Sequence, residues 1–165
     1  MIPLLFAIQM AGTRLEAFRH GFLTGVLFYG LSLFWLNHVS GLGWIFVMCL
    51  EGFFLGVFAW FAFEGKKITH RFLRAFWIAS AWTAMEILRS EIPVFGFGWN
   101  LLAYSQSHHP VVLMSADTVG AYGLGFVIAC VNTVAFELIE LDLQIRQKVA
   151  QGKKPVATGI ALIPG

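Results

Sequence analysis

The sequence has few charged residues. Charged side chains make up 12% of its 165 residues and hydrophobic side chains 58%. Globular proteins average about 25% charged and about 45–50% apolar residues. A soluble domain of this size could not hide so much apolar surface, since small domains expose a large fraction of their residues to water. The composition therefore excludes a soluble fold and predicts an integral membrane protein.

The sequence also lacks the residues of several common sites. It has two cysteines, Cys49 and Cys130, both in apolar stretches, where we expect small buried hydrophobic residues and neither a disulfide nor a metal pair. No glycine-rich phosphate loop or metal-spaced His cluster is present, and His108 and His109 are adjacent, which suits a solvated loop better than a metal site. The net charge of +2 forms no continuous basic stripe, which argues against a nucleic-acid partner. No metal or cofactor is predicted.

Ten of the eleven Lys and Arg residues fall in three segments, 13–20, 64–74 and 144–154. Long apolar stretches separate these segments. Because Lys and Arg are enriched in the cytoplasmic loops of membrane proteins, the pattern predicts three cytoplasmic loops of a multi-pass protein. Arg89 is the exception and is expected on the opposite side.

Five apolar passages are expected to form membrane segments. They span residues 2–10, 21–38, 42–63, 72–88 and 111–139. A helix needs about 20 residues to cross the hydrocarbon core, so the first passage is too short, and a further apolar run opens at Pro155 shortly before the sequence stops. We therefore expect residues 1–165 to form a single all-α membrane domain, a polytopic transmembrane helix bundle, truncated at both ends.

Residues 93–110 interrupt this pattern. They are bounded by Pro93 and Pro110, and they are apolar but rich in glycine and aromatic residues. Prolines and glycines disfavour a regular spanning helix. We expect a re-entrant or interfacial outer loop here.

Glu51, Glu86 and Arg89 are charged residues within an expected span or next to its end. Glu51 lies at the middle of its passage, where an ionised carboxylate is costly, so it must be protonated, paired or facing a wet interior. Glu86 and Arg89 are three residues apart, share a helix face near its outer end, and can form an ion pair.

The region around these residues carries an ordered set of motifs. In chain order they are W-x-x-x-E-x-x-R at Trp82 to Arg89, a glycine and aromatic turn from Gly96 to Trp99, Tyr104-Ser105-Gln106, Asp117, and G-x-x-G-x-x-F at Gly120 to Phe126. This order resembles the membrane domain of bacterial apolipoprotein N-acyltransferases, and Phe18 to Leu36 is similar to an early span of the same family. One departure is Gly98, where many members carry proline.

The resemblance implies a function for the parent protein. Members transfer an acyl chain from a phospholipid to the N-terminal diacylglyceryl-cysteine of lipoproteins, at the outer face of the bacterial inner (cytoplasmic) membrane. Their Glu, Lys and Cys act through an acyl-thioester in an extracytoplasmic domain of the carbon-nitrogen hydrolase type. That domain is missing from this sequence, so we expect this chain to be non-catalytic on its own.

The resemblance also suggests candidate substrate-binding residues in the membrane part. These are Glu86, Arg89, Phe97, Trp99, Tyr104, Ser105 and Gln106. Arg89 could hold a lipid phosphate by paired hydrogen bonds, while Phe95, Phe97 and Trp99 line an acyl groove. The alternative is that Glu86 and Arg89 form an ion pair that pins the loop, and that the aromatic residues are an interfacial belt.

Two other functions remain open from the sequence. The chain could be a noncatalytic membrane scaffold that docks a separately encoded catalytic domain. It could also be a small proton-coupled transporter that uses Glu51 and Asp117 along a pathway. No inverted repeat supports the transporter hypothesis.

Overall fold

The computed structural model describes residues 1–93 and 96–151, and in this part of the chain every regular element is a helix. The α-helices are α1 (Ile2–Met10), α2 (Arg14–Ser32), α3 (Gly41–Glu64), α4 (Arg71–Glu91), α5 (Pro110–Met114) and α6 (Ala116–Ala150). The 3-10 helices are η1 (Phe34–His38), η2 (Gly65–Lys67) and η3 (Leu102–Gln106). The all-α prediction is confirmed. Phe95 and the apolar run that opens at Pro155 lie outside the described residues.

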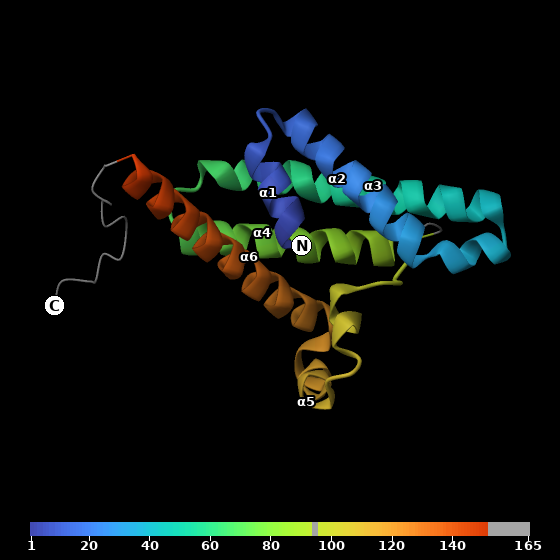
Figure 1. The fold of residues 1–165 in the computed structure, drawn as a ribbon. Helices are drawn as coiled ribbons and strands as arrows, with labels where there is room; N and C mark the ends of the chain where they lie inside the picture. The colour runs from blue at the N-terminus through green and yellow to red at the C-terminus, as the bar shows by residue number, and fades with distance from the viewer. Residues whose placement is uncertain (94–95, 152–165) are drawn as a thin grey trace.

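The helices form a layered arrangement. α2 packs along α3, α3 packs against α4, and α6 crosses α4 obliquely (Figure 1). The short helix α1 lies against α2, α3 and α6. α5 and the loop before it project away from the other helices at the lower edge of the view (Figure 1).

Polar caps fix where the two longest N-terminal helices begin. The Thr13 hydroxyl accepts a hydrogen bond from the Glu16 backbone N–H at 3.2 Å, and the Ser40 hydroxyl accepts one from Gly43 N–H at 3.1 Å. Each bond satisfies an N–H group that has no partner within its own helix. The Ser40 cap begins α3 and so ends the connection that follows α2, residues 33–40.

The α2–α3 pair is built on glycine. A Cβ atom at Gly21 would lie 2.5 Å from the Leu55 carbonyl oxygen, and one at Gly25 would lie 2.7 Å from the Gly52 Cα. Small residues of this kind allow two helix backbones to approach closely. The Gly21-x-x-x-Gly25 spacing therefore marks a real helix contact.

The basic segments meet at one end of the bundle. Arg14 forms an ion pair with Glu64, and the Lys66 ammonium donates hydrogen bonds to the backbone oxygens of Gln9 and Ala11, both at 2.8 Å. The basic N-terminus of α4 and the acidic part of α6 meet there too. The pairs are Arg71 and Arg74 with Glu137 and Glu140. Charged side chains thus link the N-terminus of α2 to the C-terminus of α3, the C-terminus of α1 to η2, and the N-terminus of α4 to α6.

The expectation that these basic segments are loops is wrong for most of their length. Residues 14–20 form the first turns of α2, residues 71–74 begin α4, and residues 144–150 continue α6. The α6 extension is supported by the ion pair of Arg146 with Asp142, four residues apart, at 2.7 Å. Because ion pairs of this kind form along one helix, α6 can continue from its apolar part into a charged part without ending.

The last apolar passage was expected to be one segment over residues 111–139, and the structure divides it. α5 ends at Met114, α6 begins at Ala116, and Gly120 then interrupts α6 with a φ of 71°. That φ lies in the left-handed region, which glycine adopts without the strain a side chain would cause. The direction of the chain changes here.

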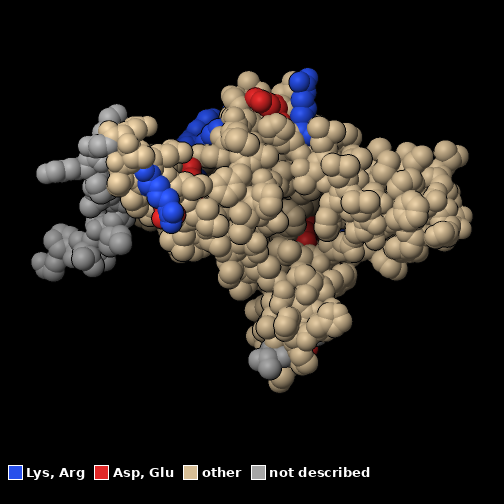
Figure 2. Space-filling view, in the orientation of Figure 1, with Lys and Arg blue, Asp and Glu red and all other residues tan. Residues whose placement is uncertain are grey.

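Two helical stretches of the described chain are long and apolar enough to cross a membrane. They are Gly41–Lys67 and Ala116–Ala150. The sequence predicts five membrane segments, so the number of crossings remains a prediction. Many large apolar side chains are nevertheless exposed, including Leu31 at 79% and Leu42 at 83%. In Figure 2 the Lys and Arg side chains lie over the upper and left parts of this face, and the end of the α2–α3 hairpin carries none.

The cysteines are less buried than expected. Cys49 is exposed and Cys130 is half-buried. Neither is among the buried residues of its helix, α3 for Cys49 and α6 for Cys130.

We expect Gly25→Ala to destabilise the chain. The new Cβ would meet the α3 backbone, and overpacking of this kind costs about 1–3 kcal/mol. Gly30→Ala on the same helix is the matched control, since its nearest neighbour is the flexible tip of Met48, 3.3 Å away. Thermal unfolding in detergent micelles, followed by circular dichroism, should show a lower transition temperature for Gly25→Ala alone. Equal transitions would contradict close packing at Gly25.

Candidate functional site

Arg89 lies in the last turn of α4, and its side chain is completely buried. Its Nη1 donates hydrogen bonds to Glu51 Oε2 at 2.8 Å and to the backbone oxygens of Phe97 at 3.1 Å and Trp99 at 3.0 Å. Its Nη2 donates to the Asn100 backbone oxygen at 3.1 Å. One guanidinium therefore binds α3 and three carbonyl groups of the outer loop to α4.

Glu51 is the carboxylate partner of Arg89. Of the three states expected for Glu51, the structure shows the paired one, with both side chains fully buried. A buried ion pair is favourable only when further hydrogen bonds satisfy its remaining polar atoms. The loop carbonyls supply those bonds to the terminal nitrogens of Arg89, whereas Arg89 Nε and Glu51 Oε1 have no hydrogen-bond partner among the described residues.

Arg89 was expected to pair with Glu86, and the structure gives it Glu51 as partner in place of Glu86. Glu86 Oε1 accepts a hydrogen bond from the Leu102 backbone N–H at 2.6 Å. Its other oxygen faces α6, where a Cβ on Gly125 would lie 2.9 Å from it. Glu86 and Arg89 share a helix face, but each reaches a different part of the outer loop.

The outer loop is an ordered reversal of the chain. The Phe97 N–H donates to the Arg89 backbone oxygen at 2.8 Å, and Asn100 has a φ of 56°. A Cβ on Gly96 would lie 2.5 Å from the Ser90 backbone oxygen, so only glycine fits there. Gly98, by contrast, has a φ outside the left-handed region, and a Cβ there would make only ordinary van der Waals contacts. The loop therefore does not require glycine at position 98.

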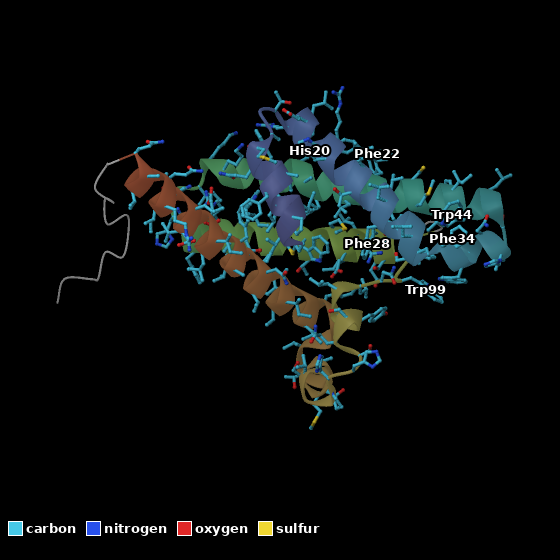
Figure 3. All side chains as sticks on the ribbon, viewed as in Figure 1. His20, Phe22, Phe28, Phe34, Trp44 and Trp99 are labelled. Carbon is cyan, nitrogen blue, oxygen red and sulfur yellow. The ribbon has the colours of Figure 1, made fainter. Side chains whose placement is uncertain are left out.

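The structure brings the candidate site residues together on and under this loop. Glu86 and Arg89 lie beneath it, and Phe97 is half-buried. Trp99 is 54% exposed, with its ring 5.2 Å from that of Trp35. Figure 3 shows Trp99 beside the end of the α2–α3 hairpin that carries Phe34 and Trp44.

The remaining three candidates lie in η3, where Tyr104 and Ser105 are exposed and Gln106 is half-buried. Tyr104 is 54% exposed. The Ser105 hydroxyl donates to the Leu102 backbone oxygen at 2.7 Å, and Gln106 Nε2 donates to the Ser105 hydroxyl at 3.0 Å. His108 and His109, near the end of the outer loop, and Asp117 of α6 lie outside this arrangement and are exposed.

Two residues of the site were missed by sequence reasoning. Asn100 Nδ2 donates to the Ser32 hydroxyl at 2.9 Å, which fastens the loop to the end of α2. These residues are 68 positions apart, and no spacing rule relates them. Both line a pocket of about 470 Å³ between α1, α2 and the outer loop.

We expect Arg89→Met to destabilise the chain strongly. The substitution leaves Glu51 as a buried charge without a counter-ion, a loss of about 3–5 kcal/mol in comparable pairs. Arg146→Met is the matched control, because its ion pair with Asp142 is largely exposed and should contribute little. Unfolding in mixed micelles should separate the two variants clearly. Similar unfolding curves would show that the Arg89 network does not hold the loop.

We expect Glu51→Gln to destabilise the chain more than Glu86→Gln does. Glutamine at position 86 retains an oxygen that can accept the Leu102 N–H, whereas glutamine at position 51 removes the charge that neutralises Arg89. The unfolding transition should therefore fall further in Glu51→Gln. An equal or larger fall in Glu86→Gln would mean that Glu86 is the main counter-ion of Arg89.

The family model and the similar proteins that match this chain all carry the name apolipoprotein N-acyltransferase. Residues 1–134 match the family model for the apolipoprotein N-acyltransferase N-terminal domain. The chain is 32% identical over 148 residues to an apolipoprotein N-acyltransferase of Geobacter metallireducens, a match of 83% of this chain and 28% of that protein. It is 24% identical over 139 residues to one of Rickettsia bellii, covering 76% of this chain and 27% of that protein.

The matches cover most of this chain but little of each relative. A third relative, from Rhizobium leguminosarum, is 28% identical over 130 residues, with 70% of this chain and 23% of that protein covered. The chain thus spans about a quarter of the length of the curated relatives it matches. No solved structure matches it. Since the family model matches most of the residues, this chain belongs to the apolipoprotein N-acyltransferase N-terminal domain family.

Proposed function

We propose that this chain is the membrane part of an apolipoprotein N-acyltransferase. The complete protein would transfer an acyl chain from a phospholipid to the N-terminal diacylglyceryl-cysteine of lipoproteins. The observation that carries this proposal is the outer loop, which Arg89 and Glu86 fasten to the bundle and which presents aromatic and hydroxyl side chains at one end. Such a surface suits the boundary between lipid tails and head groups.

The chain by itself is proposed to be non-catalytic. Acyl transfer through a thioester needs a thiolate with a nearby base. In the described part of the chain, neither Cys49 nor Cys130 has a hydrogen bond to a basic side chain, and both lie on apolar helices. The catalytic groups would come from the portion of the relatives that this chain does not match.

We place the chain in the bacterial inner membrane as a multi-pass protein. The basic segments meet at one end of the bundle, and the positive-inside rule would put that end in the cytoplasm. Arg89 and the outer loop are at the other end of α4, about 27 Å from Arg71 at 1.5 Å per helical residue. The site would then face the outer leaflet.

Arg89 and Glu86 are proposed to position the loop. Arg89 has no exposed side-chain surface, and both of its terminal nitrogens donate hydrogen bonds within the protein, so a lipid phosphate has no access to its guanidinium. We assign contact with the phospholipid donor to the loop surface itself. The residues concerned are Phe97, Trp99, Tyr104, Ser105 and Gln106.

The transporter hypothesis loses support from the same pairing. Glu51 was one of two carboxylates proposed for a pathway, and its ion pair with buried Arg89 explains its place within α3. The scaffold hypothesis differs from our proposal only in whether the catalytic part belongs to the same protein.

A chimera would test the proposed function. This chain replaces the matched 28% of the Geobacter metallireducens relative, and the chimera is expressed in a bacterium depleted of its own enzyme. We expect mass spectrometry to find N-acylated lipoproteins with the chimera and none with the chain alone.

Two controls make this result interpretable. The Arg89→Met chimera should lose activity together with thermal stability, while the Arg146→Met chimera should retain both. A chimera that inserts into the membrane and folds but leaves lipoproteins unmodified would refute the proposal, and N-acylation by the chain alone would refute its non-catalytic role.

A further inference from the structure

The pocket beside the outer loop has the size of a ligand site. Its volume of about 470 Å³ lies within the range of about 300–1,000 Å³ that is usual for small-molecule sites. Its walls come from α1, α2, α3, α4 and the outer loop, so residues far apart in the sequence build it together.

One end of the pocket is apolar and buried. Leu4 of α1 is 6% exposed and Leu55 of α3 is 4% exposed. Leu55 packs where α2 carries Gly21 and Gly25, so this end lies deep in the contact between α2 and α3. No charged side chain lines the pocket among those that the structure describes, although Met1, which carries the α-amino group, is one of the lining residues.

The other end is polar and open. Ser32 and Ser105 are exposed, and Asn100 is half-buried. The Ser32 hydroxyl accepts the bond from Asn100 Nδ2, but its own proton has no acceptor among the described residues. Asn100 has a second amide proton. This mouth can therefore donate hydrogen bonds to a ligand carbonyl.

The pocket follows one face of α2 between these ends. Thr24, Phe28 and Ser32 line it at intervals of four residues, which corresponds to about 12 Å along the helix axis. Figure 3 shows Phe28 on the part of α2 that faces the outer loop and Trp99. A ligand that fits must be elongated, apolar at one end and polar at the other.

The volume of the pocket distinguishes between two elongated apolar ligands, a protein α-helix and an extended alkyl chain. An α-helix with its side chains is about 10 Å across, so one turn of about 5.4 Å would fill the whole pocket. An extended alkyl chain is much thinner and can run the full distance from Ser32 to Leu55. The pocket fits a lipid tail better than a protein helix.

We propose that this pocket binds one acyl chain of a phospholipid, with the ester carbonyl at Ser32 and Asn100 and the chain end at Leu4 and Leu55. The inference rests on the proposed function and deepens it by locating one tail of the donor. Leu4 and Leu55 would then limit the length of the chain that fits.

Photolabelling would test the proposal on the 165-residue chain in lipid nanodiscs. The probe is a phosphatidylglycerol with a diazirine near the end of one acyl chain, and mass spectrometry maps the labelled residues. We expect a saturable label around Leu4 and Leu55 that excess unlabelled phospholipid removes. A diazirine next to the ester should instead label residues 100–105.

A pair of tryptophan substitutions on α2 supplies the control. Thr24→Trp fills the pocket and should reduce the inner label by at least about tenfold. Leu27→Trp, on the outward face and 66% exposed in the wild-type chain, should leave it unchanged. Circular dichroism should show that both variants fold. Competition with unlabelled phospholipid tests the wild-type chain and so does not depend on the folding of a variant.

Other outcomes would overturn the inference. Label at Leu55 that is no stronger than at exposed Val131, or that excess lipid does not remove, would mean ordinary boundary lipid. An unlabelled inner end would mean that the space suits an apolar protein segment. Because labelling measures binding and the chimera measures acyl transfer, either proposal can fail without the other.

Discussion

The buried ion pair between Arg89 and Glu51 is the interaction on which the outer end of the structure depends. A guanidinium taken out of water is costly unless every donor is used. Arg89 meets most of this requirement through one carboxylate and three backbone carbonyls. Those carbonyls belong to a loop with little regular structure of its own, so the pair stabilises the loop and the loop stabilises the pair.

The two ends of the bundle use charge in different ways. At the end that carries the basic segments, Arg71 and Arg74 face Glu137 and Glu140, and the charges balance across α4 and α6. At the other end two buried carboxylates, Glu51 and Glu86, share the neighbourhood of one guanidinium, and one oxygen of each has no hydrogen-bond partner in the described part. The first arrangement joins helices. The second holds the outer loop in place.

Local patterns predicted the helices well where their limits are set locally. The apolar passages at 42–63 and 72–88 became α3 and α4 with boundaries within three residues, because a serine cap or a proline stands at an end. The passage at 111–139 was less well predicted. The structure divides it after Met114 and interrupts α6 again at Gly120, whose left-handed φ was not expected because Gly120 resembles the neighbouring helical glycines in sequence.

The sequence by itself determined the helical class, the apolar character, the clustering of basic residues and the group of residues around the outer loop. Composition and spacing along the chain are enough for these, because they follow from local propensity and from the cost of charge in an apolar medium. Only the tertiary structure decided that Arg89 pairs with Glu51, that Asn100 is bound to Ser32, and that these contacts border a pocket. The partners are 38 and 68 residues apart, and helix packing alone brings them within hydrogen-bonding distance.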